Sequence, residues 1–135
     1  MTRNYSNADE VLDSIWTVVE FGSFPERPNV GSIGIFGSQP LKIAVTWNDV
    51  LAVEFLLDAG AAINAKHEGG DTALHHAIRM GNFGVARLLI RRGADQSIRN
   101  DDGELPRELC WSGEWEGLGL ISTSLTRGPL GSGPP

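Results

Sequence analysis

The sequence predicts an all-α solenoid of about two full repeats, with a helical N-terminal cap and a degenerate C-terminal cap. The first observation is internal repetition. Residues 39–44 align with residues 72–77, and residues 56–61 align with residues 89–94, at the 33-residue spacing that separates Leu41 from Leu74. The second is that each repeat contains two apolar segments at helical spacing, followed by a glycine. A fixed period of this size is typical of stacked small units, which bind other macromolecules through an extended face.

Composition narrows the function further. The chain has 135 residues and a net charge of −6, and phosphate neutralisation needs clustered Lys and Arg, so we expect no nucleic-acid partner. Cys110 is the only cysteine, which excludes an internal disulfide and a thiolate zinc site. We see neither a long apolar run nor a secretory signal after Met1, and so expect no membrane partner and a cytoplasmic protein.

The N-terminal segment predicts a capping helix over residues 7–21. Asn7 and Glu10 have the spacing of a capping box. Val11, Ile15 and Val18 then fall on one helical face, and we expect them to pack against the first repeat. Residues 22–38 are rich in Gly and Pro and predict a long connection.

Two helix pairs follow. In the first, residues 41–45 form a short helix, a break at residues 48–49 starts a longer helix, and Gly60 ends it. In the second, Thr72 opens the short helix, residues 83–92 form the longer one, and Gly93 ends it. The third unit is a fragment, in which residues 100–103 match the preceding turn and residues 105–109 occupy the short-helix position. We therefore divide the chain into a capping helix with its connection (1–33), the repeats (34–111), and a degenerate cap with a flexible tail (112–135).

These residues resemble ankyrin repeats. The second unit reads Gly70-Asp71-Thr72-Ala73-Leu74-His75-His76-Ala77 and later Gly93-Ala94-Asp95, which is similar to the family's T-P-L-H-x-A and G-A-D motifs. The first unit departs from the pattern at Gln39 and Lys42, and the third at Leu105. The resemblance implies that the incomplete end units are caps, which shield the terminal faces of a stack.

The candidates for chemistry are few. The resemblance implies that His75 is a structural histidine that hydrogen-bonds near the Thr72 hydroxyl, whereas His76 is less usual there and is expected to be partly exposed. Cys110 falls where the family places a small buried residue. We find no catalytic motif, no metal-ligand spacing and no cofactor signature, and we predict a non-catalytic protein.

The resemblance places the binding site on a concave face formed by the turn tips and the outward side of the short helices. Trp47 is the sharpest candidate, with the alternative that it packs sideways on the N-terminal segment; Met80 is its equivalent one repeat later. The residues that this face implies are Thr46, Trp47, Glu68, Asp71, Arg79, Met80, Arg99, Asp101, Asp102 and Glu104.

The acidic members of this set favour a cationic partner, although a solvated turn is the alternative for each one. The chain is similar to small stand-alone bacterial ankyrin proteins, many of which resemble immunity factors. This implies an immunity or inhibitor protein, monomeric when free, that neutralises a basic toxin or enzyme. The alternatives are a general adaptor or regulatory subunit, and an enzyme or metal protein built on the scaffold.

Overall fold

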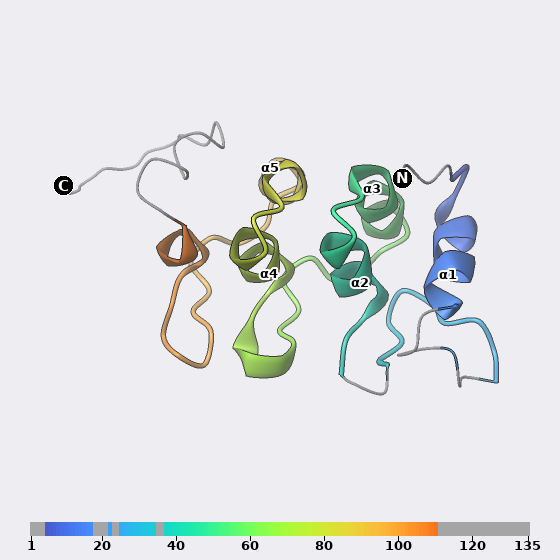
Figure 1. The fold of residues 1–135 in the computed structure, drawn as a ribbon, viewed down its shortest axis with the longest axis horizontal. Coiled ribbons are helices and arrows are strands. Elements are labelled where there is room, and N and C mark those ends of the chain that lie inside the picture. The colour runs from blue at the N-terminus through green and yellow to red at the C-terminus, as the bar shows by residue number, and fades with distance from the viewer. Residues whose placement is uncertain (1–4, 18–21, 23–24, 35–36, 111–135) are drawn as a thin grey trace.

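The computed structural model describes residues 5–17, 22, 25–34 and 37–110. In that part of the chain it contains α-helices and short 3-10 helices and no strand, which confirms the all-α prediction. Helices α2 (Pro40–Thr46) and α3 (Val50–Asp58) form one pair, and α4 (Ala73–Arg79) and α5 (Phe83–Arg91) form the next. Figure 1 shows the two pairs side by side, with α2 and α4 in an inner layer and α3 and α5 in an outer layer.

The core runs through the stack between these layers. Each pair buries leucine, valine and alanine side chains at helical spacing, and apolar burial of this kind is the main stabilising term. The inner helices pack against each other, and so do the outer helices, as expected for a solenoid in which each repeat contacts its neighbours. The largest fully buried apolar side chains are Val11, Ile15, Leu41, Val45, Val53, Leu56, Leu74, Leu88 and Leu89.

Each end of the described stack carries a single helix. At the N-terminal end, α1 (Ala8–Trp16) packs on α3 and α2 through Val11 and Ile15, as predicted, whereas Val18 lies outside the described residues. At the C-terminal end, the short-helix position of the third unit is a 3-10 helix, η2 (Pro106–Leu109), which packs on α4. Trp111 and the predicted degenerate cap over residues 112–135 lie outside the described residues.

The predicted capping box of α1 is only half formed. Asn7 Oδ1 accepts a hydrogen bond from the Glu10 backbone N–H at 3.0 Å, but the Glu10 carboxylate accepts from Ser6 N–H rather than from Asn7 N–H. The carboxylate therefore satisfies the backbone donor one residue further out. Of the two side chains, the one that caps α1 is therefore Asn7, because the Ser6 N–H lies outside the helix.

The helix ends follow the repeat. Gly60 and Gly93 both have positive φ, as their predicted role as helix stops requires. The turn between the two helices of each repeat also needs a left-handed residue. Gly81 supplies it in the second repeat, and the equivalent residue in the first is Asn48, with φ +54°. Asparagine adopts this conformation more readily than other non-glycine residues, which explains why the break at residues 48–49 works without glycine.

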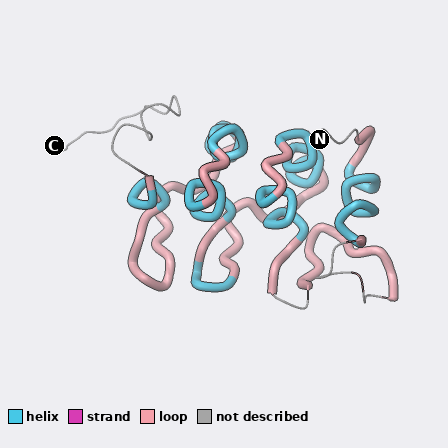
Figure 2. The backbone as a smooth tube through the Cα atoms, in the orientation of Figure 1, coloured by secondary structure: helices cyan, strands magenta, loops and turns pink. Residues whose placement is uncertain are grey.

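The connections between repeats project from one side of the stack. Figure 2 shows these loops beside the inner helices α2 and α4. The tip of the second loop includes a 3-10 turn, η1 (Glu68–Gly70), and the Asp101 N–H donates to the Gly69 carbonyl at 2.9 Å. Neighbouring tips are thus tied together. None of the described helices has the length and apolar run that a membrane crossing needs.

Candidate functional site

The N-terminal cap of α4 fixes the geometry of the inner face. Thr72 Oγ1 accepts from the His75 backbone N–H at 3.4 Å, and the His75 Nδ1 accepts from the Thr72 backbone N–H at 3.1 Å. Since Nδ1 is an acceptor, the proton of the neutral ring lies on Nε2, which donates to the Glu104 carbonyl at 2.8 Å. Nδ1 of the fully buried His75 therefore caps α4 within the second repeat, and Nε2 holds the third turn on that repeat. This confirms the structural role predicted for His75.

Asp71 is the centre of a second polar network. Its carboxylate accepts two hydrogen bonds from the Arg79 guanidinium, each at 3.2 Å, and one from Asn100 Nδ2 at 2.9 Å. The buried Asn100 also donates to the Glu104 carboxylate at 3.0 Å, and Arg79 lies 3.9 Å from that carboxylate. Asp71, Arg79 and Glu104, which are predicted to face a partner, are joined in one network in the free chain, and this network holds two turn tips in one arrangement.

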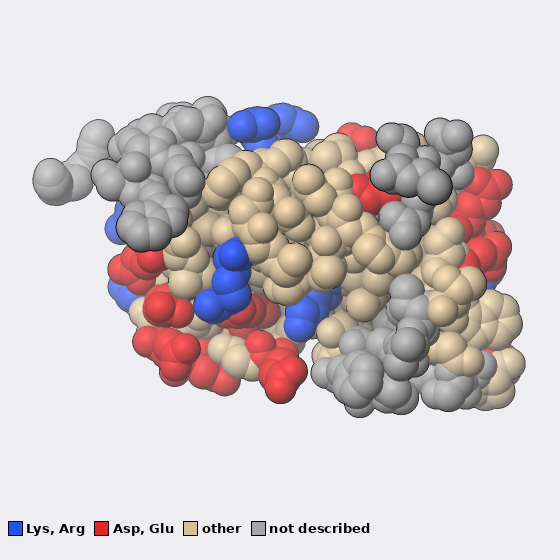
Figure 3. Space-filling model, viewed as in Figure 1, with Lys and Arg blue, Asp and Glu red and all other residues tan. Residues whose placement is uncertain are grey.

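Other predicted acidic residues point to solvent. Glu68, Asp101 and Asp102 are exposed, and the described residues provide no ion pair for any of them. Arg99 is also exposed, and its guanidinium donates to the Gly103 carbonyl at 2.7 Å and lies 3.8 Å from Glu108. Figure 3 shows acidic side chains gathered at lower left, over the tips of the second and third turns. Figure 3 shows a second group of acidic side chains at the right edge of the view, where α1 lies.

The ends of the inner helices add an apolar element. Met80 is the C-cap of α4 and is 46% exposed. Trp47 is the C-cap of α2, is half-buried and packs against the core, so only part of its ring is available to a partner. Thr46 is exposed beside it. The structure thus places these predicted residues at equivalent ends of neighbouring helices.

Two further histidines lie between the repeats. The Thr46 hydroxyl donates to the Lys42 carbonyl at 2.9 Å, so at 2.8 Å His76 Nε2 is the donor to Thr46 Oγ1. Burial, and then the Lys42 ammonium, lower the pKa of His76 to about 4, and the same two causes lower the pKa of His67. Both rings are therefore neutral at pH 7, and Lys42 gives this part of the face a positive charge.

Reasoning from the sequence missed the organising role of Asn100 and the contribution of Lys42. At Asn100 the sequence predicts only the start of a turn. In the structure this side chain is 6% exposed, and its amide group joins Asp71 to Glu104 through two hydrogen bonds. The signal available in the sequence was its position directly before Asp101-Asp102-Gly103, where an Asn side chain accepts from backbone N–H groups two and four residues later.

In the described part of the chain, no group of three or more His, Cys, Asp or Glu side chains is placed to hold a metal. Cys110 is half-buried against the core.

A family model described as "Ankyrin repeats (3 copies)" matches residues 13–100. Protein phosphatase 1 regulatory subunit 27 of Homo sapiens is 41% identical over 83 residues, which cover 62% of this chain and 54% of that protein. The ADP-ribosylation factor GTPase-activating protein AGD4 of Arabidopsis thaliana is 42% identical over 67 residues, which cover 50% of this chain and 9% of that protein. These two proteins are thus matched over about half of their length or much less.

A similar solved structure is the ankyrin repeat domain of Bcl-3, a member of the IkappaB family. It superposes with a TM-score of 0.62 at 33% sequence identity, and the match covers 67% of this chain and 40% of that one. The similarity therefore extends from the motifs to the spatial arrangement of the helices.

Proposed function

Because the chain belongs to the ankyrin-repeat family, whose repeats form protein-binding modules that are generally non-catalytic, we propose that it binds a protein partner through the face formed by its inner helices and turn tips. We call this surface the inner face. It comprises Thr46, Trp47, Glu68, Asp71, Arg79, Met80, Arg99, Asp101, Asp102 and Glu104.

The proposal rests on accessible side chains that recur at the C-terminal ends of the neighbouring inner helices α2 and α4. Thr46 and Trp47 end α2, Arg79 and Met80 end α4, and the 33-residue period brings the two ends to equivalent places on neighbouring helices. An exposed methionine beside a partly exposed tryptophan offers an apolar anchor of the kind that dominates interface energetics. Such an anchor needs a rigid support, which the network centred on Asp71 provides.

Charge narrows the class of partner. Glu68, Asp101 and Asp102 lie on the tips without a cationic partner among the described residues. Unpaired exposed carboxylates attract a basic surface and speed its association. The proposed partner is therefore a protein with a basic patch beside an apolar side chain that contacts Met80.

What the partner does is the finer part of the proposal. An immunity or inhibitor protein of bacterial, cytoplasmic type, which covers a basic toxin or enzyme in a one-to-one complex, fits an acidic rim on a small rigid stack. A regulatory subunit or adaptor fits the same face, and the name of the matched phosphatase regulatory subunit favours this second candidate.

The test is affinity capture from lysate of the source organism with the full chain as bait. We expect one dominant protein to be captured by the unmodified chain and lost with Met80→Ala or Trp47→Ala, each costing more than about 1 kcal/mol of binding free energy. Gln96→Ala, an exposed residue outside the inner face, is the matched control and is expected to retain the partner. Because Trp47 is half-buried, circular dichroism must show that its variant is folded.

Capture that is equal for all four baits would remove the inner face from the proposal. Once a partner is in hand, its own activity separates the two finer candidates. Stoichiometric loss of that activity on adding the chain supports the inhibitor, whereas unchanged activity or relocation of the partner supports the adaptor.

A further inference from the structure

Two polar junctions lie between neighbouring turns of the stack, and they are built from equivalent positions. In the second junction, between the second and third turns, the Asp71 carboxylate accepts hydrogen bonds from Arg79 and Asn100. In the first junction, between the first and second turns, the 33-residue period places His67 at the position of Asn100. The same period places Ser38 at the position of Asp71. The first junction therefore has a hydroxyl group where the second has its central carboxylate.

The first junction also contains polar groups without partners. Lys42 lies on α2 at the repeat position of His75, and its ammonium group makes no hydrogen bond or ion pair within the part of the chain that the structure describes. The Nε2 atom of His67 is buried and has no hydrogen-bond partner there either. The two groups are close enough for the Lys42 ammonium to lower the pKa of His67. A buried polar atom without a partner is costly, so a group that binds both would stabilise the junction.

The tip of the first turn leaves room for such a group. A Cβ on Gly37 would meet nothing within 4 Å, whereas a Cβ on its repeat equivalent, Gly70, would be blocked by Asp101 of the next turn. Helices α2 and α4, which carry Lys42 and His76, pack side by side at this junction (Figure 1). The first junction is therefore open on the side of the turn tips, where the second junction is closed.

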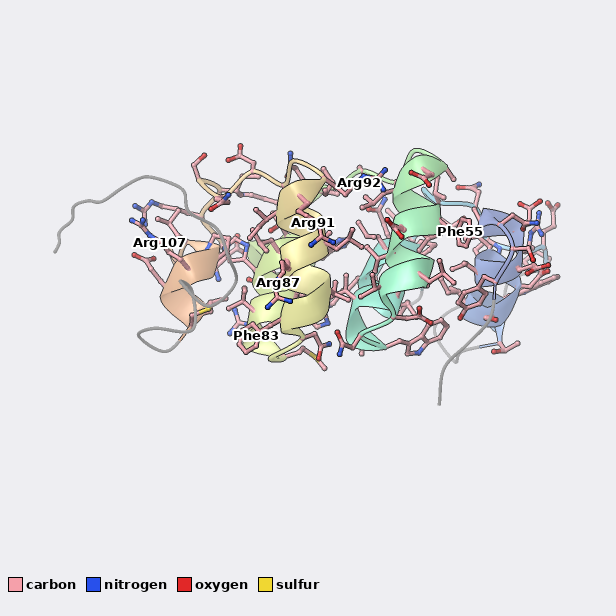
Figure 4. The ribbon with its side chains drawn as sticks, turned by 90° about the horizontal axis from the view of Figure 1, so that it is seen from above. Phe55, Phe83, Arg87, Arg91, Arg92 and Arg107 are labelled. Atoms are coloured by element: carbon pink, nitrogen blue, oxygen red, sulfur yellow. The ribbon has the colours of Figure 1, made fainter. Side chains whose placement is uncertain are left out.

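The charges of the junction favour a carboxylate. Asp71 would repel an anion, but its carboxylate is already bound by the Arg79 guanidinium and the Asn100 amide. Lys42 is on an inner helix and carries an unpaired positive charge. Figure 4 shows that three other cations lie at the outer helix α5 instead: Arg87, Arg91 and Arg92. An acceptor with a negative charge thus complements the first junction better than a neutral one does.

We propose that the first junction is a carboxylate-binding subsite of the inner face, in which Lys42 and His67 bind an aspartate or glutamate side chain of the protein partner. This inference rests on the proposed function, because its ligand belongs to the partner of the inner face. The partner's carboxylate takes the place that Asp71 has in the second junction. One oxygen pairs with the Lys42 ammonium and the other accepts from His67 Nε2–H. Because Nε2 is buried in the free chain, binding requires a side-chain movement, which the flexible stem of Lys42 allows.

A polyanion fits this subsite less well than a single acidic side chain does. The net charge of −6 and the exposed carboxylates of Glu68, Asp101 and Asp102 would oppose its approach. The same carboxylates attract the basic patch of the proposed partner, which brings its own acidic residue to Lys42. The partner is therefore expected to carry one acidic side chain beside its basic patch.

The test is a nuclear magnetic resonance titration of the full chain, labelled on its histidine ring nitrogens, with N-acetylglutamate α-amide. This probe presents one side-chain carboxylate. At about pH 7.5, where both rings are neutral, we expect a saturable shift of the His67 Nε2 resonance. The uncharged isostere, N-acetylglutamine α-amide, should bind about tenfold more weakly, because hydrogen bonds to charged groups are the stronger ones. Inorganic phosphate is the third probe.

Three variants locate the binding. Lys42→Met removes the ammonium but keeps an apolar stem, and should weaken the glutamate probe by about tenfold. Lys66→Met makes the same change in net charge at an exposed lysine and should weaken it by less than about twofold. Ser38→Asp supplies the missing carboxylate from the chain itself, so it should raise the midpoint of thermal unfolding and abolish probe binding. Because Ser38 is buried, backbone amide spectra must show that this variant is folded, and the two lysine variants decide if it is not.

Several results would overturn the subsite. They are the absence of a saturable shift at His67, equal binding of the two amides, or equal losses in the two lysine variants. Tighter binding of phosphate than of the glutamate probe would overturn the carboxylate in favour of a phosphate ligand. The titrations contain no partner, so they can fail while the capture experiment succeeds, and the reverse. With Lys42→Met as bait, weaker capture than with Lys66→Met supports the partner's carboxylate as the ligand, whereas equal capture excludes it.

Discussion

The two repeats have the same apolar core but are held by different polar contacts. In the second repeat, Thr72 and His75 cap α4 reciprocally, and the ring continues to the Glu104 carbonyl of the next turn. In the first, Gln39 makes no side-chain cap to α2, which begins instead with Pro40. The start of α4 is therefore tied to the next turn by a buried hydrogen bond, whereas the start of α2 relies on proline, whose fixed φ suits the first turn of a helix.

The same contrast appears at the turn tips. Gly37 and Gly70 are repeat equivalents, and both have positive φ. A Cβ on Gly37 would meet nothing within 4 Å, whereas one on Gly70 would lie 2.7 Å from the Asp101 backbone nitrogen. Polar ties to the third turn thus require close backbone approach, which the first repeat does not need. The difference concerns how closely neighbouring backbones approach at the turn tips.

The largest expected loss of unfolding free energy comes from substitutions in the apolar core, which the two repeats share. Leu41 and Leu74 are equivalent and are 2% and 1% exposed, so Leu41→Ala and Leu74→Ala should each lower the free energy of unfolding by about 2–5 kcal/mol. Urea denaturation followed by circular dichroism measures both. If one substitution cost less than half as much as the other, the apolar layers would not be equivalent, and the contrast between the repeats would extend to the core.

The next effect tests the turn tips. Gly70→Ala should cost about 2–3 kcal/mol, because a left-handed alanine is strained and its Cβ would push against Asp101, whereas Gly37→Ala should cost about 1 kcal/mol from backbone strain alone. Thermal unfolding of the two variants gives the comparison. Equal losses would show that the backbone at Asp101 accommodates the added Cβ without cost.

The third effect tests the helix caps. Thr72→Val keeps the shape of the side chain and removes its hydroxyl, so it should cost about 1–2 kcal/mol of unfolding free energy. Gln39→Thr has the opposite purpose. It introduces a capping side chain at the start of α2 in the first repeat and should raise the free energy of unfolding by up to about 1 kcal/mol. Denaturation midpoints for the two variants should therefore move in opposite directions. A shift of both in the same direction would mean that the caps do not distinguish the repeats.

Much of this fold follows from the 33-residue period, because the period sets both the core positions and the glycines that end the helices. The role of His75 followed from the Thr72 motif for the same reason. The inner face was less predictable. The predicted partner-facing residues Asp71, Arg79 and Glu104 are joined in one network through Asn100. No local pattern reveals contacts that cross 25 or 29 residues of sequence, as those of Arg79 with Glu104 and of Asn100 with Asp71 do. Lys42 stands where the family pattern has His, and its charge acts on His67 and His76 only after the helices stack.

At neutral pH the smallest expected effect comes from the protonation of His76 at the contact between the repeats, and this effect grows as the pH falls. Burial and Lys42 lower the pKa of His76 to about 4 in the folded chain, against 6.5 as its ordinary value. The nearby Asp71 opposes this shift, and His67 and Arg79 add to it. The unfolded chain therefore takes up a proton before the folded chain does. The free energy of unfolding should fall as the pH drops from about 6.5, and the loss attributable to His76 should be complete near pH 4.

The comparison is between the unmodified chain and His76→Gln, whose amide can still donate to Thr46. Urea unfolding at pH 6.5, 6.0, 5.5 and 5.0 lies above the range in which ordinary carboxylates titrate, so histidine dominates the slope. The variant should lose less stability over this range than the unmodified chain does. His67 has a pKa shifted in the same direction, so some slope should remain in His76→Gln and fall further in His67→Gln/His76→Gln. Parallel curves for the three proteins would mean that His76 is as accessible to protons in the folded chain as in the unfolded one. The contact between α2 and α4 would then be more open to water than the hydrogen bond between His76 and Thr46 indicates.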